Sequence, residues 1–134
     1  MDTMLTKKQS LLLVLVAIIA IGLLSFLKFN SGIGLKQQAN LIIFFDDQHQ
    51  RSFQGEVKDG MSVLTALEAS SKAGKFDVRY AIEKNGEVKL YSIADKINET
   101  DKKWVFFLND KIIDSKSIGI TDLRKSDIIE AKYK

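Results

Sequence analysis

The pattern of hydrophobic and polar residues divides the chain into one long apolar segment and a following region of short alternating segments. Residues 11–27, LLLVLVAIIAIGLLSFL, contain a single polar side chain, Ser25, and Phe29 extends the segment if the ammonium group of Lys28 reaches the membrane interface. As a helix this segment spans roughly 25–28 Å at about 1.5 Å per residue, close to a hydrocarbon core of about 30 Å. We therefore predict a transmembrane helix over residues 11–29.

The flanks of this segment predict its orientation. Lys7 and Lys8 lie in the short polar stretch of residues 1–10, which favours a cytoplasmic N-terminus and an extracytoplasmic C-terminal domain. Phe26 and Leu27 stand where a cleavable signal peptide has small residues, so we favour an uncleaved anchor over a signal that is removed. Residues 30–39, which begin NSGIG, are then a linker.

One amphipathic segment, DGMSVLTALEASSKAG over residues 59–74, predicts the helix of the globular part. Ser62 can cap its start, and Gly74 can adopt the left-handed conformation that ends it. Apolar residues three and four apart form one buried face, while small residues let a sheet approach closely. The apolar residues are Val63, Leu64 and Leu67, and the small ones are Ala66, Ala69 and Ala73.

Strand patterns surround this helix. LIIFF over residues 41–45 and WVFFL over residues 104–108 are apolar on both faces, as in strands that are covered on two sides. Alternating patterns predict the other strands, and residues 94–103 are polar enough to be an exposed loop. These further strands cover residues 52–57, 76–82, 88–93, 111–113 and 128–133.

Two dipeptides predict tight hairpin turns. Asn85 and Gly86 suit a turn in which both central residues have positive φ, and Asn109 with Asp110 suits a second one. One helix and a mostly antiparallel, mixed sheet predict an α+β fold in which the sheet wraps the helix, a β-grasp-like arrangement over residues 40–134.

The charge balance excludes a nucleic-acid partner. The chain has 20 Lys and Arg against 17 Asp and Glu, but four of the lysines and one aspartate precede residue 37, which leaves sixteen against sixteen in the folded part. The basic excess therefore flanks the apolar segment and forms no basic patch on the domain. The chain has no Cys, so it has no disulfide and no thiolate metal site.

Several motifs resemble the transcobalamin-like C-terminal domain family. The helix entry, Gly60 to Glu68, is similar to the family's helix-entry motif, and three later stretches are similar in the same order: residues 88–93, residues 104–109 and residues 127–133. The chain departs from the family at Asp110 and Ser126, where the family usually has Gly. The resemblance implies a β-grasp domain in a bacterial surface protein, and it admits a cobalamin-like ligand.

Candidate chemistry is sparse. Asp46, Asp47 and His49 could supply three metal ligands, but a polar surface turn explains the same residues, and we predict no metal site. No nucleophile-elbow signature and no glycine-rich phosphate loop occur, so we predict no enzymatic activity.

The strands that are apolar on both faces raise the question of what covers the second face, because one helix covers only one. Either the chain's own strands cover it, or it is an exposed aromatic patch for a ligand or partner. Trp104, Tyr91 and Asn109 are the predicted members of such a patch. The predicted function is a membrane-anchored extracytoplasmic module that binds a small molecule or a protein partner, and the alternative is a structural or accessory subunit of a cell-envelope complex.

Overall fold

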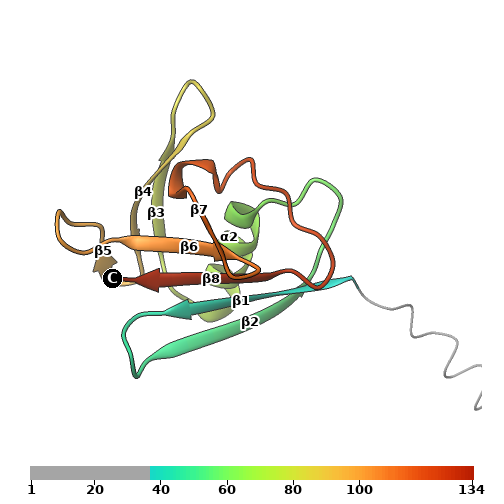
Figure 1. The fold of residues 1–134 in the computed structure, drawn as a ribbon, viewed down its shortest axis with the longest axis horizontal. Helices are drawn as coiled ribbons and strands as arrows, with labels where there is room; N and C mark the ends of the chain where they lie inside the picture. Colours follow the sequence, from blue (N-terminus) through green and yellow to red (C-terminus); the bar gives the residue numbers. More distant parts are fainter. Residues whose placement is uncertain (1–36) are drawn as a thin grey trace, which may run out of the picture. The chain divides into compact units, whose positions relative to one another are not determined.

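A computed structural model describes residues 37–134, in which two sheets enclose one α-helix (Figure 1). The predicted transmembrane segment and its orientation lie outside the described residues, as does most of the linker. Among residues 37–134 no helix is long and apolar enough to cross a membrane. The elements are β1 (Gln38–Phe44), β2 (Gln50–Glu56), α2 (Val63–Gly74), β3 (Val78–Ile82), β4 (Val88–Ile93), β5 (Lys96–Ile97), β6 (Trp104–Leu108), β7 (Lys111–Ile113), the 3₁₀ helix η1 (Ser115–Ser117) and β8 (Ile128–Tyr133).

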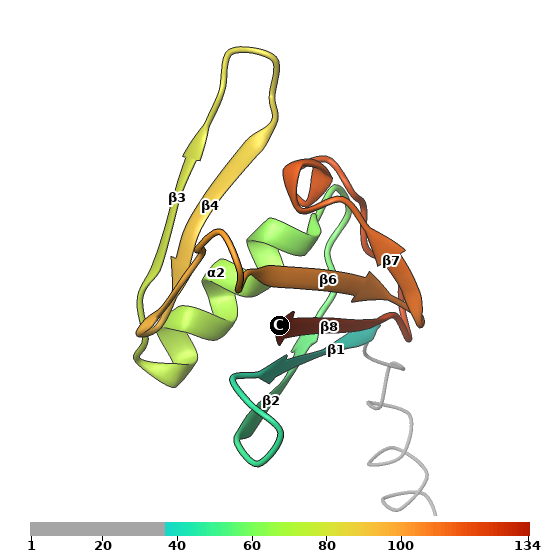
Figure 2. The same ribbon diagram turned by 60° about the vertical axis from the view of Figure 1, so that its left-hand side comes forward.

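The larger sheet is mixed, as predicted. Its strand order is β2-β1-β8-β6-β7, in which β1 runs parallel to β8 and the other neighbours are antiparallel. The expectation of a single sheet is wrong, because β3, β4 and β5 form a separate three-stranded sheet. Figure 2 shows α2 between the β3–β4 hairpin and the larger sheet, so the helix is covered from two sides.

The helix α2 begins as predicted and ends differently. Ser62 caps it by accepting a hydrogen bond from the Thr65 amide at 3.2 Å. The left-handed residue at its end is Lys75, with φ 54°, and the prediction of this conformation for Gly74 is wrong. Glycine is required at position 74 for space, since a Cβ there would lie 2.8 Å from ring atoms of both Phe53 and Phe76.

The turns follow the sequence in most cases. Asn109 and Asp110 have φ of 50° and 66°, as their turn type requires, and Ser126 also has a positive φ of 67°. The turn at Asn85 and Gly86 is different from the prediction, because only Gly86 has a positive φ. There the Asn85 side chain accepts a hydrogen bond from the Glu87 amide at 3.0 Å, which fits a type I turn followed by a glycine bulge.

The core lies between α2 and the two sheets. Alternate residues of the central strands point into it, and they meet Val63, Leu64 and Leu67 from the helix, as predicted. Residues 94–103, predicted as an exposed loop, contain β5, whose backbone holds the buried Trp104 indole: Nε1–H donates to the Lys96 carbonyl at 3.0 Å. The strand residues of the core include Leu41, Ile43, Leu90, Ile93, Trp104, Phe106, Ile129 and Ala131.

Candidate functional site

An apolar pocket of about 140 Å³ opens between the β1–β2 hairpin and α2. It lies on the core side of the larger sheet, beneath the edge strand β2. Small and aliphatic side chains dominate its wall, with a few polar groups at its rim. The lining residues are Ala39, Asn40, Leu41, Phe53, Gln54, Gly55, Glu56, Val57, Met61, Ala66, Ala69, Ser70, Ala73, Leu123 and Ile129.

The pocket exists because side chains are missing on both of its walls. Gly55 points no side chain toward the helix, and a Cβ built there meets nothing within 4 Å. Opposite, α2 presents alanines three and four residues apart. Ala69 and Ala73 are exposed, so the expectation that a sheet would pack closely on these alanines is wrong. The small residues leave a groove open instead.

Arg51 joins the β1–β2 hairpin to the end of α2. Its guanidinium donates a hydrogen bond to the Gly74 carbonyl at 2.8 Å, at the C-terminal end of the helix. The same group lies 5.5 Å from the ring centre of Phe53 and 5.3 Å from that of Phe76, within the range of cation–π attraction. These contacts hold Phe53 in the pocket wall and tie the hairpin to the helix end.

The structure separates the three predicted site residues. Trp104 is 2% exposed and belongs to the core, so its expected place in an exposed patch is wrong. Its ring packs against Phe45 and Tyr133, with ring centres 5.8 and 5.3 Å away. Alternation along β6 places Trp104 on the same face as the buried Phe106, and the hydrogen bond to the Lys96 carbonyl satisfies the indole N–H there.

Asn109 follows the other end of β6 and has a structural role. Its side-chain amide donates to Asp127 at 2.8 Å and accepts from the Ile128 amide at 2.9 Å, which joins the β6–β7 turn to the start of β8. Tyr91 is 43% exposed on β4, with the Lys89 ammonium 5.6 Å from its ring centre. The three residues therefore form no common surface, and ligand binding by Tyr91 or Asn109 stays a prediction.

The second face of the larger sheet fits neither of the two expectations, because a lysine, and not a further strand, lies over its aromatic rings. Strand pairing places Phe44, Lys132 and Val105 side by side across this face, and Ile42, Glu130 and Phe107 likewise. The ammonium of Lys132 lies 5.0 Å from the Phe44 ring centre and 4.9 Å from that of Phe107, and it pairs with Glu130 at 3.0 Å. The lysine therefore lies along the face and covers much of both rings.

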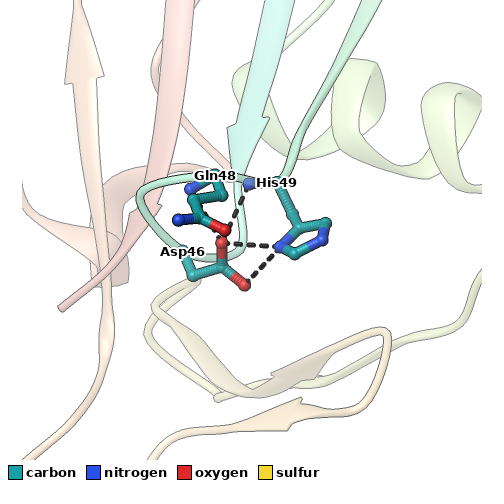
Figure 3. A network of polar contacts seen from close by, with 3 residues as sticks. All are labelled: Asp46, Gln48 and His49. Carbon is teal, nitrogen blue, oxygen red and sulfur yellow. Dashed lines mark hydrogen bonds and ion pairs between the residues drawn. The ribbon is translucent and has the colours of Figure 1, made fainter.

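The carboxylate of Asp46 is bonded to other groups of the same turn (Figure 3). Asp46 Oδ1 accepts from the Gln48 and His49 amides at 2.9 and 2.8 Å, and both carboxylate oxygens lie within 2.8 Å of His49 Nδ1. The Gln48 amide first, and then the His49 ring, hold the pKa of Asp46 below its ordinary value of 3.8. Within residues 37–134 no three His, Asp or Glu side chains are grouped to hold a metal ion.

Sequence reasoning did not single out the pocket. Two signals were present: a glycine inside the alternating pattern of residues 52–57, and alanines that recur along one face of the helix. The alanines were interpreted as room for a sheet to pack closely, although they are equally compatible with an open groove, and the glycine was interpreted only as part of a strand. The sequence does not show whether the space beside a small residue is filled by a neighbour.

Comparisons with known proteins show a shared fold. No family model matches the chain, and no curated protein matches it. Two solved structures are similar at 14% sequence identity, and each covers 72% of this chain. One is a candidate metal-binding protein from Ruminococcus gnavus, with a TM-score of 0.57 and 95% of its chain covered. The other is haptocorrin in complex with Cbi, with a TM-score of 0.59.

The present chain spans about a quarter, 24%, of haptocorrin's length. Haptocorrin is a protein of the transcobalamin family, so the resemblance noted in the sequence is supported as a distant fold relationship. At this identity the similarity concerns the fold alone.

Proposed function

We propose that residues 40–134 are a β-grasp binding module without catalytic activity, which an uncleaved transmembrane helix over residues 11–29 holds outside the cytoplasm. The observation that carries the binding role is the apolar pocket between β1–β2 and α2. It is concave, lined mainly by apolar groups and rimmed by a few polar ones, as ligand sites are. The fold shared with haptocorrin is also consistent with ligand binding, but it supports the proposal less specifically than the pocket does.

The size of the pocket limits the ligand. Sites for drug-sized molecules are about 300–1,000 Å³, whereas this pocket has about 140 Å³. An apolar cavity of about 150 Å³ in another protein accepts benzene. We infer that the pocket takes one small apolar group, either part of a small ligand or one side chain of a protein partner. A cobalamin-like ligand would place only a peripheral group inside it.

The alternative function is a structural or accessory subunit of a cell-envelope complex. It is favoured by apolar side chains that no described residue covers: Ile112 is 69% exposed and Ile128 44% exposed on the second face of the larger sheet. Such side chains suit contact with another subunit.

The pocket is tested by filling it. We would titrate indole and cobinamide separately into the 134-residue chain in lipid nanodiscs and follow the heat of binding and the melting temperature. A ligand at a hundred times its dissociation constant stabilises the folded state by about 2.7 kcal/mol. We expect indole to bind, and Gly55→Leu to abolish binding because the added side chain grows into open space.

The matched control is Ser52→Leu, which adds the same side chain to the opposite face of the same strand. It is expected to bind indole like the parent chain. Binding that survives Gly55→Leu, or is lost equally in Ser52→Leu, would contradict the pocket as the site. If neither indole nor cobinamide binds, the small-ligand role is contradicted, and a side chain of a protein partner becomes the proposed occupant of the pocket.

A further inference from the structure

The free edge of β2 is unlike the other sheet edges. The two sheets end in β2, β7, β3 and β5. The last three have features that protect edges from pairing: β7 has three residues and β5 two, and the pairing of β3 is interrupted between Arg79 and Tyr80. In contrast, β2 pairs with β1 over seven residues without a shift of register. Of the strands in residues 37–134, β2 alone presents a long, regular edge.

The backbone of β2 directs hydrogen-bonding groups away from the sheet. The Phe45 amide donates to the His49 carbonyl at one end of the hairpin, and the Val57 amide donates to the Gln37 carbonyl at the other. In an antiparallel pair, successive residues of a strand direct their N–H and C=O groups alternately toward the partner strand and away from it. Because His49 and Val57 bond toward β1, the odd-numbered residues between them do so as well. The N–H and C=O groups of Ser52, Gln54 and Glu56 therefore point outward, where a further strand can bind.

The charges of β2 permit such pairing. Arg51 is turned inward, because its guanidinium bonds to the Gly74 carbonyl. Glu56 lies at the other end of the strand. Antiparallel pairing of two β2 strands brings the Arg51 end of each beside the Glu56 end of the other, with the two side chains on opposite faces of the sheet, so like charges are kept apart.

We infer that β2 is a self-association surface, which pairs antiparallel with β2 of a second copy around Gln54. In this register Gln54 lies opposite Gln54 of the second copy, and Phe53 lies opposite Gly55. The Phe53–Gly55 pair is of the non-hydrogen-bonded kind, with Cα atoms about 4.5 Å apart, so the ring can cover the glycine and the mouth of the pocket. Twofold symmetry makes this contact twice, and no like charges face each other.

This inference goes beyond the proposed function, because pairing of the edge requires no ligand. The chain has no Cys, so single cysteines report proximity directly. In membranes that contain the 134-residue chain, Gln54→Cys should form a reducible dimer on mild oxidation with copper phenanthroline. The expected Cα separation of about 5.5 Å is within the 4.4–6.8 Å of disulfides.

The register has its own controls. Glu56→Cys alone should not cross-link, because the two cysteines would be four residues apart along the strand, about 13 Å. Chains carrying Ser52→Cys and Glu56→Cys, mixed, should cross-link to each other. Ile112→Cys, on the opposite edge strand β7, should give no dimer. Equal dimer from Ile112→Cys and Gln54→Cys would indicate random collision and overturn the inference.

A blocking variant separates edge pairing from folding. Ser52→Pro removes an amide that points outward and leaves the bonds of β2 to β1 in place, as edge strands tolerate. Added to Gln54→Cys, it should abolish the dimer while the circular dichroism melting curve stays that of the single variant. A dimer that persists, no dimer from Gln54→Cys, or cross-linking of Gln54→Cys to a different protein would each overturn pairing with a second copy.

Discussion

At the scale of single residues, Gly74 is enclosed by two aromatic rings that leave no room for a side chain. A Cβ at this position would meet Phe53 and Phe76 at 2.8 Å. Overpacking of this kind costs about 1–3 kcal/mol, which exceeds the gain of up to about 1 kcal/mol that alanine brings to a helix interior. We expect Gly74→Ala to lower the free energy of unfolding by about 1 kcal/mol or more in urea denaturation.

Gly55→Ala is the matched control for this substitution. Its Cβ would meet nothing within 4 Å, so the same chemical change should leave the stability unchanged or slightly higher. If Gly74→Ala stabilised the protein as much as the control, the enclosure of Gly74 by the two rings would be refuted.

Trp104 is a core residue, and its truncation should act on folding. The indole is 2% exposed and donates one hydrogen bond to Lys96. Removing a buried Trp side chain costs about 3–5 kcal/mol. We expect a loss of this size for Trp104→Ala in denaturant titrations, and a change of about 0.5 kcal/mol or less for the exposed Tyr91→Ala. A small loss of unfolding free energy for Trp104→Ala would contradict the burial of Trp104 in the core.

At the scale of elements, one hydrogen bond joins α2 to the smaller sheet. The Tyr80 hydroxyl on β3 donates to the Glu68 carboxylate on the helix. This bond, together with burial and the charge of Glu68, raises the pKa of Tyr80 above its ordinary value of 10.0. The neutral phenol is therefore favoured in the folded state.

The sign of the pH dependence follows from this shift. A raised folded-state pKa gives a stabilisation that is fully present below the unfolded pKa of about 10 and is lost as the pH rises through the folded pKa. We expect the free energy of unfolding to fall between about pH 10 and the higher folded-state pKa. Glu68→Gln should flatten this fall, and Tyr80→Phe should remove the contribution of this group. An identical pH profile for Glu68→Gln would contradict the role of Glu68.

The elements themselves were largely readable from the sequence, because their signals are local. Ser62 as a cap, the alternation in β4, the apolar run of β6, and the turn at Asn109 and Asp110 depend on neighbouring residues only. Asp110 and Ser126, which stand where the related family usually has Gly, both adopt positive φ. Asp and Ser therefore support the left-handed backbone at these two turns without a glycine.

The errors arose where distant residues decide. Lys75, and not Gly74, has the left-handed conformation at the end of the helix, and Gly74 is instead the residue that lies against the rings of Phe53 and Phe76. The division into two sheets arises because β3, β4 and β5 pair only among themselves and with no strand of the larger sheet. The two residues of β5 also have no recognisable pattern in the sequence. The pocket likewise depends on Gly55 and the alanines of α2 remaining uncovered by a side chain from elsewhere.

At the scale of the whole molecule, the charge and the apolar residues are distributed unequally along the chain. Residues 37–134 carry equal numbers of acidic and basic side chains and contain their own core. Residues 1–36 carry the basic excess and the long apolar run. The lysine that lies over Phe44 and Phe107 reduces the apolar surface that the folded part presents to water.

This distribution predicts how the two parts of the chain fractionate. We expect the 134-residue chain to sediment with membranes, to resist extraction by high salt and alkaline carbonate, and to be released by detergent, because an apolar segment of this length inserts into lipid. Residues 37–134 alone should stay in the soluble fraction. Mass spectrometry of the membrane-bound chain should find residues 1–36 still attached. A chain in the soluble fraction that lacks its first residues would show instead that the apolar segment is a cleaved signal, and the folded domain would then have no tether.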